Sequence, residues 1–311
     1  MKEYTVSPSP HIRDSITTSK IMLHVIIATI PAMAASAIFF SWRALTLIAF
    51  CALSAMVWER LCCFIMKRPD STDDLSAMVT GILLAFNLPV TLPIWMAAVG
   101  TFVSIVIVKQ LFGGLGQNFA NPAIVGRIVL MLSFTSYMTH WVLPNGLDAV
   151  STATPLVTED SFSYFDLFIG RCGGCIGETS ALALLIGGVY LCIVRVIKPY
   201  APLAFIGTVY LFSAAAGRDP IYQILSGGLM LGAIFMATDY VTTPVTNKGR
   251  VIFGIGCGLI TCVIRFWCSP PEGVSYSILL MNIVTPYIDM FTRKKAVGGI
   301  YRRKESREEK N

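Results

Sequence analysis

One stretch gathers several side chains that could carry chemistry: DAVSTATP at positions 148–155, which holds a carboxylate and three hydroxyl groups. Its local pattern favours a structural role. A threonine followed by proline, as in Thr154-Pro155, is typical of a helix N-cap with proline at the first helical position. Ser151 and Thr152 are then turn residues. From these residues alone a capped turn is the simpler interpretation, and a reactive hydroxyl is the alternative.

Two further patterns resemble redox and nucleotide motifs. Cys172-Gly-Gly-Cys175 has the spacing of a dithiol. It lacks the two further ligands of an iron–sulfur cluster, so a pair of small residues beside a helix is the simpler interpretation. GGLGQN (113–118) follows an apolar segment rather than a strand, and Phe119 stands where a dinucleotide motif needs its third glycine. The histidines show no metal-ligand spacing: His11, His24 and His140. We therefore expect neither a nucleotide fold nor a metal site.

A single carboxylate, Asp239, ends an apolar block in the stretch ATDYVTTP. An ionisable group at membrane depth is a functional hypothesis by default, because burying it unpaired is costly. The alternative is an interfacial carboxylate paired with Lys248 or Arg250. The residues leave both interpretations open. By contrast, Glu59 next to Arg60 is expected to be an ordinary neutralised pair near the end of a span.

The composition excludes a soluble protein. Of the 311 residues, 55% are hydrophobic and 14% are charged, and the mean hydropathy is +0.68. A chain so poor in charge cannot cover a water-facing surface. The apolar residues come in blocks of about 15 to 23, the length that crosses a bilayer as a helix.

The blocks predict an all-α integral membrane protein with about ten transmembrane helices. The third span is short, and Pro89 and Pro93 bracket a tight turn after it. The expected spans are 21–42, 44–66, 75–88, 93–112, 122–138, 179–197, 201–217, 221–238, 250–268 and 274–292.

The orientation follows from the Lys and Arg residues between the spans. They concentrate in alternate connections, beginning with the N-terminal segment, even when the basic tail is left out. This count assigns Lys109 to an inside connection and Arg265 to an outside one. Both termini are therefore expected in the cytoplasm. The polar first twenty residues predict no cleavable signal peptide.

The net charge of +6 does not indicate a nucleic-acid partner, because the basic residues crowd the C-terminal tail, as in a solvated cytoplasmic segment. The nine cysteines form no disulfide framework. The connection 139–178 is long, acidic and rich in aromatic residues, so we expect a functional, ordered outside loop. The expected parts are segment 1–20, a five-helix half 21–138, loop 139–178, a second half 179–292 and tail 293–311.

Two halves of five spans each must insert in opposite senses, which predicts an inverted repeat. NPAIVGR (121–127) and TPVTNKGR (243–250) are faint echoes of one another. They indicate either matching broken segments of the two halves or ordinary helix starts.

Over nearly its full length the sequence resembles the RnfD subunits of the Rnf-type ion-translocating ferredoxin:NAD oxidoreductases, and the homologous membrane subunits of the sodium-pumping NADH:quinone oxidoreductases. The quinone-reductase homologues have a longer N-terminal extension, so the Rnf family fits better. The motifs that carry the resemblance, in order, are SPHIRDSITTSKIM, SAMVTGILLAFNLP, KQLFGGLGQNFANPA, DAVSTATPL, GETSALALLIGG and FMATDYVTTPVT.

The resemblance implies a covalent FMN. In this family an exported flavin transferase joins FMN through a phosphoester to the last threonine of the loop motif, which is Thr154 here. Asp148, Ser151 and Ala153 match the same motif. Thr152 departs from it, since the family has glycine there, and threonine resists the positive φ that glycine allows.

The resemblance also implies a second flavin position. The homologue binds riboflavin without a covalent bond, and it is left open whether this chain does. Asn118, Asn121 and Asp239 are candidate polar contacts for it, and GGLGQN is then a glycine-rich break that lets the backbone approach a partner or this flavin.

We therefore expect a subunit of an electron-transport complex in a bacterial or archaeal cytoplasmic membrane, coupled to Na⁺ or H⁺ movement and inactive alone. The ferredoxin and NAD⁺ sites are expected on partner subunits. One alternative is a solute channel or secondary transporter without flavin, since inverted repeats serve that purpose too. Another is a purely structural scaffold.

Overall fold

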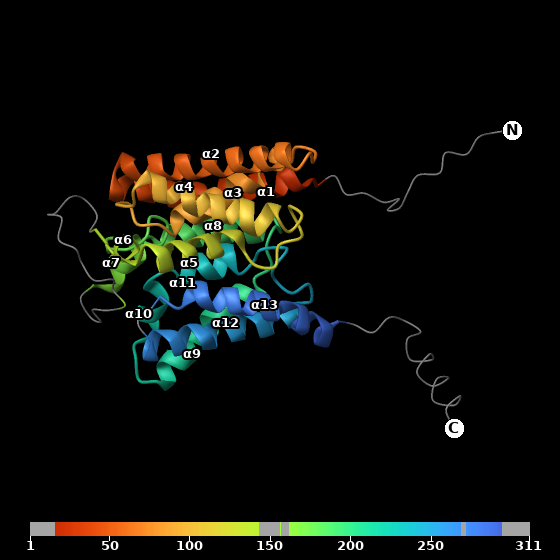
Figure 1. Ribbon diagram of the computed structural model, residues 1–311. Coiled ribbons are helices and arrows are strands. Elements are labelled where there is room, and N and C mark those ends of the chain that lie inside the picture. Colours follow the sequence, from red (N-terminus) through yellow and green to blue (C-terminus); the bar gives the residue numbers. More distant parts are fainter. Residues whose placement is uncertain (1–15, 143–155, 157–161, 269–271, 294–311) are drawn as a thin grey trace, which may run out of the picture.

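A computed structural model of the chain describes residues 16–142, 156, 162–268 and 272–293. These residues form long, roughly parallel helices joined by short connections (Figure 1). The first half contains α1 (Thr18–Phe40), α2 (Trp42–Ile65), η1 (Thr72–Asp74), α3 (Ser76–Phe86), α4 (Ile94–Phe102), η2 (Val103–Gln110), α5 (Pro122–Ser133) and α6 (Thr135–Met138). After α7 (Tyr164–Ile169), the second half contains α8 (Ala181–Ile193), α9 (Tyr200–Ala215), α10 (Pro220–Leu225), α11 (Leu229–Leu231), η4 (Gly232–Met236), α12 (Asn247–Trp267) and α13 (Val274–Thr292).

The helix surfaces are those of a membrane protein. Four of the described helices are long and apolar enough to cross a bilayer, namely α1, α2, α12 and α13, and several others are shorter and apolar. Large apolar side chains point outward along them, such as Phe64 and Phe291, which are 82% and 85% exposed. Apolar exposure on this scale suits hydrocarbon and would make a soluble monomer aggregate.

Every expected span contains a helix. In two of the spans, the fifth and the eighth, the helix is interrupted. The fifth stops at Ser133 and resumes as the short α6. The eighth is interrupted between α10 and α11, where Gly227 takes φ +63°, a conformation that residues with a Cβ rarely adopt. The backbone at this break is therefore available for contacts with other parts of the chain.

Close packing inside the first half explains the short third span. A Cβ on Gly81 of α3 would lie 2.5 Å from the carbonyl oxygen of Cys51 on α2, so only glycine permits this approach. α3 ends at Phe86, and α4 starts directly after Pro93. The pair forms the expected tight hairpin.

The two similar segments, NPAIVGR and TPVTNKGR, do not occupy equivalent positions in the two halves of the chain. NPAIVGR opens α5, the fifth long element of the first half, whereas TPVTNKGR opens α12, the fourth of the second. Each is a capped helix start: Asn121 accepts hydrogen bonds from Ala123 N and Ile124 N, and Thr246 accepts one from Gly249 N. The interpretation as an ordinary helix start is confirmed for Asn121-Pro122. It is wrong for Thr243-Pro244, because α12 begins only at Asn247, after the N-cap Thr246.

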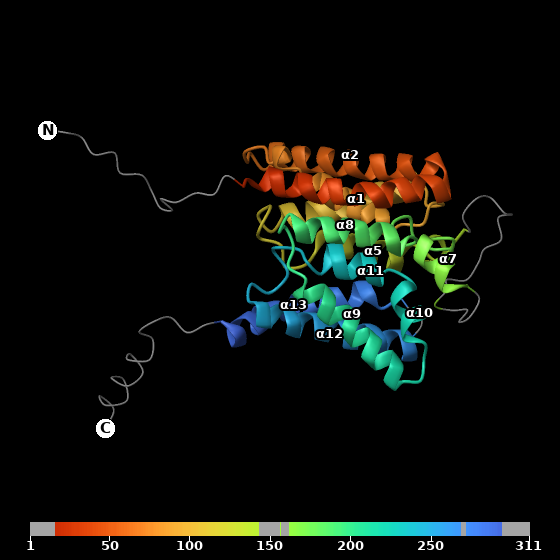
Figure 2. The same ribbon diagram turned by 180° about the vertical axis from the view of Figure 1, so that it is seen from behind.

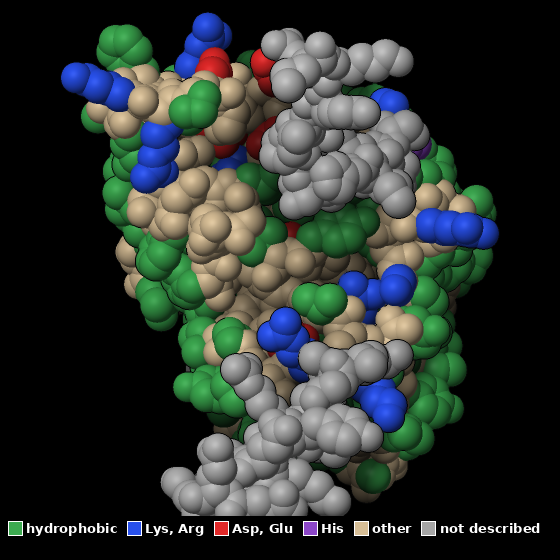
Figure 3. Space-filling model, turned by 90° about the vertical axis from the view of Figure 1, so that its right-hand side faces the viewer, with side chains coloured by type: hydrophobic (Ala, Val, Ile, Leu, Met, Phe, Trp, Pro, Cys, Tyr) green, Lys and Arg blue, Asp and Glu red, His purple; other side chains and the backbone are tan. Residues whose placement is uncertain are grey.

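Both described chain ends leave the helical body at one end, and α6, α7 and α10 lie at the other (Figures 1 and 2). Loop 143–161 connects α6 to α7, so its described flanks lie opposite the termini. Figure 3 looks onto the terminal end, where Lys and Arg side chains stand around the rim and apolar side chains cover the flanks.

Candidate functional site

The residues expected to carry a covalent group, Thr154 with Asp148, Ser151 and Ala153, lie outside the described residues. The three expected polar contacts, Asn118, Asn121 and Asp239, are described. They come from two distant parts of the chain and line one cavity near the terminal end. Its empty volume, including the open mouth, is about 760 Å³.

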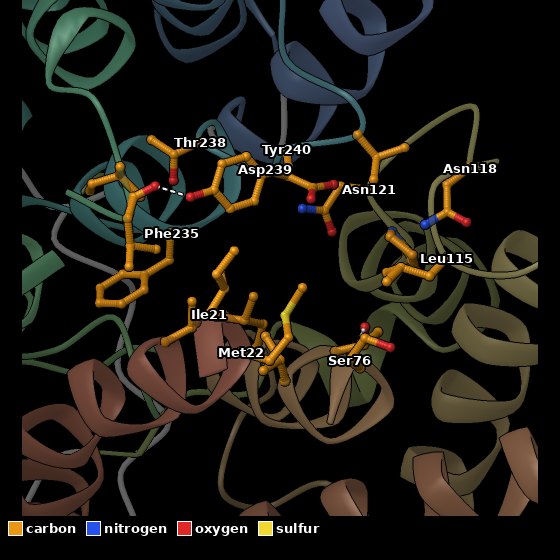
Figure 4. Close-up of a pocket in the computed structure, with 18 of the residues that line it drawn as sticks. Ile21, Met22, Ser76, Leu115, Asn118, Asn121, Phe235, Thr238, Asp239 and Tyr240 are labelled. Carbon is orange, nitrogen blue, oxygen red and sulfur yellow. Dashed lines mark hydrogen bonds between the residues drawn. The ribbon is translucent and has the colours of Figure 1, made fainter. Parts of the chain in front are cut away.

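The walls of this cavity differ in polarity. In Figure 4, Asp239 and Asn121 lie on one side and face Ile21 and Met22 of α1 on the other. The side chain of Phe235 from η4 closes one flank. Such a space suits a flat molecule with an apolar face and a polar edge.

Helix starts and breaks hold the polar residues in place. Asn121 is the N-cap of α5, and its Nδ2 also donates to Met236 O at 3.4 Å across the cavity. The buried Oδ1 of Asn118 has no hydrogen-bond partner within the described part of the chain. A buried acceptor without a partner is uncommon in a folded protein. In Figure 4 the amide nitrogen of Asn118 is on the side of the cavity.

Asp239 lies just beyond η4, where Thr242 Oγ1 donates to it at 3.0 Å. Removal from water raises the pKa of this carboxyl, and its hydrogen bonds with Thr242 and two backbone N–H groups oppose the rise only in part. Among the described ion pairs, none joins Asp239 to Lys248 or Arg250. Arg250 shares with it the lining of an adjoining cavity of about 720 Å³ and donates instead to Pro244 O at 3.0 Å. The ion-pair alternative for Asp239 is therefore wrong within the described structure.

A buried ion pair adjoins the cavity. Lys109 Nζ lies 2.6 Å from Glu59 Oε1 and 2.6 Å from Ser76 Oγ. Both charged side chains are almost fully shielded from solvent, with exposures of 1% and 0%. Gln110 also donates to Glu59, at 2.8 Å. Lys109 and Ser76 both line the cavity. The wall there is polar, and the charge of Lys109 is balanced by Glu59.

Two sequence-based expectations fail at this pair. Lys109 does not lie in a connection; it belongs to the π-helix η2 and is buried. Glu59 is not neutralised by Arg60, which points outward and pairs with Asp70 at 3.6 Å. The reason is helical geometry: adjacent residues on a helix point in different directions, so Glu59 faces the core while Arg60 faces outward.

A second buried cluster lies nearer the opposite end, and sequence reasoning missed it. Arg127 of α5 donates to Glu178 at 2.7 Å and to Glu272 at 2.6 Å. It also donates to Asn87 Oδ1 at 2.6 Å. The sequence did contain an indication of this cluster: Arg127 lies inside an apolar block, where charged residues are rare and are usually functional or paired.

Arg265, assigned from sequence to an outside connection, is instead buried in the last turn of α12. Its guanidinium donates to the carbonyl oxygens of Gln223 at 2.5 Å and Ser226 at 3.0 Å. Gln223 lies in the last turn of α10, and Ser226 lies in the break between α10 and α11. Arg265 therefore joins α12 to that break.

The remaining motifs behave as expected. GGLGQN follows the π-helix η2 rather than a strand, and Gly113, Gly114 and Gly116 take positive φ in the turn. Cys172 and Cys175 are both buried thiols. Burial raises the pKa of Cys172 to about 12, and burial also raises that of Cys175. Protonated thiols react poorly, which favours packing over redox chemistry.

Residues 5–298 match the model of the NQR2, RnfD, RnfE family. The chain is 49% identical to the D-subunit of the Na⁺-translocating ferredoxin:NAD⁺ oxidoreductase complex of Acetobacterium woodii, covering 97% of this chain and 98% of that protein. It is 42% identical to the D-subunit of the proton-translocating ferredoxin:NAD⁺ oxidoreductase complex of Clostridium ljungdahlii, over 95% and 96%. It is 38% identical to the D-subunit of the ion-translocating oxidoreductase complex of Stutzerimonas stutzeri, over 92% and 93%.

Proposed function

The chain belongs to the NQR2, RnfD, RnfE family, and from this premise we propose that it is the flavin-carrying membrane subunit of an ion-translocating ferredoxin:NAD⁺ oxidoreductase complex. It spans the cytoplasmic membrane with about ten helices in two inverted halves, with both termini in the cytoplasm. The other subunits hold the ferredoxin and NAD⁺ sites, and this chain does not catalyse the net reaction alone. The coupling ion is Na⁺ in the name of one relative and a proton in that of another.

The observation that carries this proposal is the cavity at the terminal end. Asn118, Asn121 and Asp239 were selected from the sequence as flavin contacts, and all three line it. A flavin ring offers an apolar face and an edge with N–H and carbonyl groups. The amide nitrogens of Asn118 and Asn121 would donate to the carbonyl groups of such an edge. We propose that riboflavin binds here.

A covalent FMN on Thr154 is the second part of the proposal. When bound, flavins supply one- and two-electron exchange, and the protein supplies position and electrostatics. The described residues that flank the loop, in α6 and α7, lie at the end opposite the cavity (Figure 1). The helical body would then hold one flavin near each membrane surface. A pair of carriers so placed suits electron transfer across the membrane, in step with ion movement by the complex.

The covalent flavin is tested on the complex purified from cells that contain the flavin transferase. On a denaturing gel, the band of this chain should fluoresce, and a mass spectrum of the peptide around Thr154 should show one added FMN. Thr154→Val should abolish both signals and most of the turnover. Thr158→Val, in the same loop, is the matched control and should change neither. A dark wild-type band would favour the channel or transporter alternative, and unchanged turnover in Thr154→Val would favour the scaffold.

The cavity flavin is tested separately by what acid releases from the purified complex. Wild type should release riboflavin, and Asn118→Leu and Asp239→Leu should release at least several-fold less while keeping the fluorescent band. Tyr287→Phe, on the exposed face of α13 and outside the lining of the cavity, is a control that should keep the flavin. Equal release from all variants would contradict the cavity assignment and leave the covalent site intact.

A further inference from the structure

The cavity of about 720 Å³ that adjoins the one proposed for riboflavin gathers three basic residues. Arg195, Lys198 and Arg250 line it, and Asp239 is the single acidic residue among its described lining residues. Asp239 lies in the wall that the two cavities share. Positive charge therefore outnumbers negative charge in this second cavity, which we call the basic cavity.

The turn between α8 and α9 supplies two of these cations. Arg195 follows α8 and takes φ +61°, in the left-handed region that glycine usually occupies after a helix. The turn that results brings Lys198 to the same cavity only three residues later. α8 ends and α9 begins at the end of the molecule where the termini lie (Figure 2). The two cations therefore stand near one surface of the membrane that the helices cross.

The third cation comes from the first turn of α12, which packs closely on α9. A Cβ on Gly254 would lie 2.6 Å from the carbonyl oxygen of Ala201, so only glycine permits this approach. Residues four apart lie on one face of a helix, so Arg250 is on the same face of α12 as Gly254. This face meets the start of α9, where Ala201 lines the basic cavity together with Arg250.

Neutral oxygens orient two of the cations without cancelling their charge. Lys198 Nζ lies 3.5 Å from Asn247 Oδ1, and Arg250 Nε donates to Pro244 O at 3.0 Å. Within the described part of the chain, no carboxylate forms an ion pair with any of the three basic side chains. Grouped Lys and Arg side chains between helices, near a membrane surface, favour a phosphate group.

An apolar groove begins beside the basic cavity and follows α8 and α9. Its empty volume, including the open mouth, is about 840 Å³. It is lined by apolar residues, and Ile197 lines both the groove and the basic cavity. On each helix the lining residues are spaced three or four apart, so they share one face. Examples are Leu185, Val189 and Cys192 on α8, and Pro202, Leu203 and Ile206 on α9.

The groove has a closed floor and an open rim. A Cβ on Gly188 of α8 would lie 2.8 Å from Ile234 Cγ2 of η4, and both residues line the groove. At the rim, Val189 and Leu203 are 57% and 66% exposed. In a membrane such a surface is open to hydrocarbon. The groove therefore suits an acyl chain that enters from the bilayer.

We propose that an anionic phospholipid binds here, with an acyl chain in the groove between α8 and α9 and its phosphate against Arg195, Lys198 and Arg250. A soluble anion would leave the groove unfilled. A zwitterionic lipid would bring a cationic headgroup towards three cations, which repel it. This inference requires only that the helices span a membrane, and it does not depend on either proposed flavin.

The test uses the purified complex in detergent and a phosphatidylglycerol probe with a photoreactive diazirine in one acyl chain. After illumination, mass spectrometry of peptides locates and quantifies the probe. Wild type should carry it on the groove residues of α8 or α9. Unlabelled phosphatidylglycerol should displace the probe at a concentration at least several-fold lower than phosphatidylcholine with the same acyl chains, and inorganic phosphate should not displace it.

The headgroup contacts are tested by removing two cations at once. Arg195→Gln with Lys198→Gln should abolish the preference for phosphatidylglycerol over phosphatidylcholine, because the attraction for the anionic headgroup is lost. Lys67→Gln with Lys248→Gln is the matched control. It removes two exposed cations that do not line the basic cavity, and it should keep the preference.

The groove is tested by filling it while all three cations stay in place. Leu203→Trp should lower labelling of the groove at least several-fold, whereas Leu211→Trp, exposed on α9 outside the groove, should be labelled as wild type. Equal displacement by the two lipids, or displacement by inorganic phosphate, would overturn the inference. So would a preference that survives in the Arg195 and Lys198 double variant, or full labelling of Leu203→Trp.

Discussion

The two buried cations near opposite ends of the molecule, Lys109 and Arg265, occupy similar settings and differ in one respect. Each lies near the C-terminal end of a helical element. Lys109 donates to the hydroxyl of Ser76, whereas Arg265 donates to the backbone carbonyl of Ser226. Lys109 has a carboxylate partner in Glu59. Arg265 has only neutral partners in the described structure.

The two ends differ in how each buried charge is balanced. A cation that is paired inside the protein contributes little field to the neighbouring cavity, which suits a neutral ligand such as riboflavin. At the other end, two arginines and two carboxylates share one buried cluster, because Glu178 and Glu272 pair with Arg127 and their charges also act on Arg265.

The largest effect is expected at Arg127, which neutralises two carboxylates in the same cluster as Arg265. Arg127→Met would leave Glu178 and Glu272 buried without a partner. Removing one member of a buried pair costs about 3 to 5 kcal/mol, and here two carboxylates lose their partner. We expect little folded protein, measured as the yield and thermal unfolding of detergent-purified protein. A variant of near wild-type stability would show that these carboxylates are protonated or hydrated.

The next effect is expected at the paired cation. Glu59→Leu would strand Lys109 in the core and should lower the free energy of unfolding by about 3 to 5 kcal/mol. The double variant Glu59→Leu with Lys109→Met removes both charges and should recover most of that loss, since apolar replacements of buried pairs are often neutral. Thermal unfolding of the three proteins checks this. No recovery in the double variant would mean that the pair has a role beyond mutual neutralisation.

A smaller effect concerns pH. Because the folded protein raises the pKa of Asp239, the folded state holds its proton more tightly than the unfolded state does. Stability from this residue is therefore greatest at low pH, and it falls as pH rises from the ordinary value of about 4 through the raised one. Asp239→Asn should flatten this part of the profile, measured by unfolding at several pH values. An unchanged profile would show that another group titrates there.

The smallest effect is expected at the exposed pair of Arg60 and Asp70, whose side chains are 78% and 44% exposed. Such pairs contribute about 0 to 1 kcal/mol, because water screens them. Arg60→Ala should therefore leave the unfolding temperature nearly unchanged, in contrast to Glu59→Leu one residue away. A large fall in the unfolding temperature of Arg60→Ala would mean that the exposed pair contributes as much to stability as the buried pair of Glu59 and Lys109.

The sequence by itself determined the helices and their order, since the length of an apolar block and the residues that cap it are local properties. It also determined that Asn118, Asn121 and Asp239 belong together, through motifs shared with a family. The sequence could not show that Lys109 points into the protein core. The direction of that side chain depends on the local π-helical geometry of η2.

Only the tertiary structure decided the partners of the buried charges. Lys109 and Glu59 are 50 residues apart, and Arg127 and Glu272 are 145 apart. Such pairs depend on which helix faces pack together, and a single sequence does not record that choice. Local patterns were misleading for the same reason: Glu59 and Arg60 are neighbours in the chain, and the packing of α2 sends them in opposite directions.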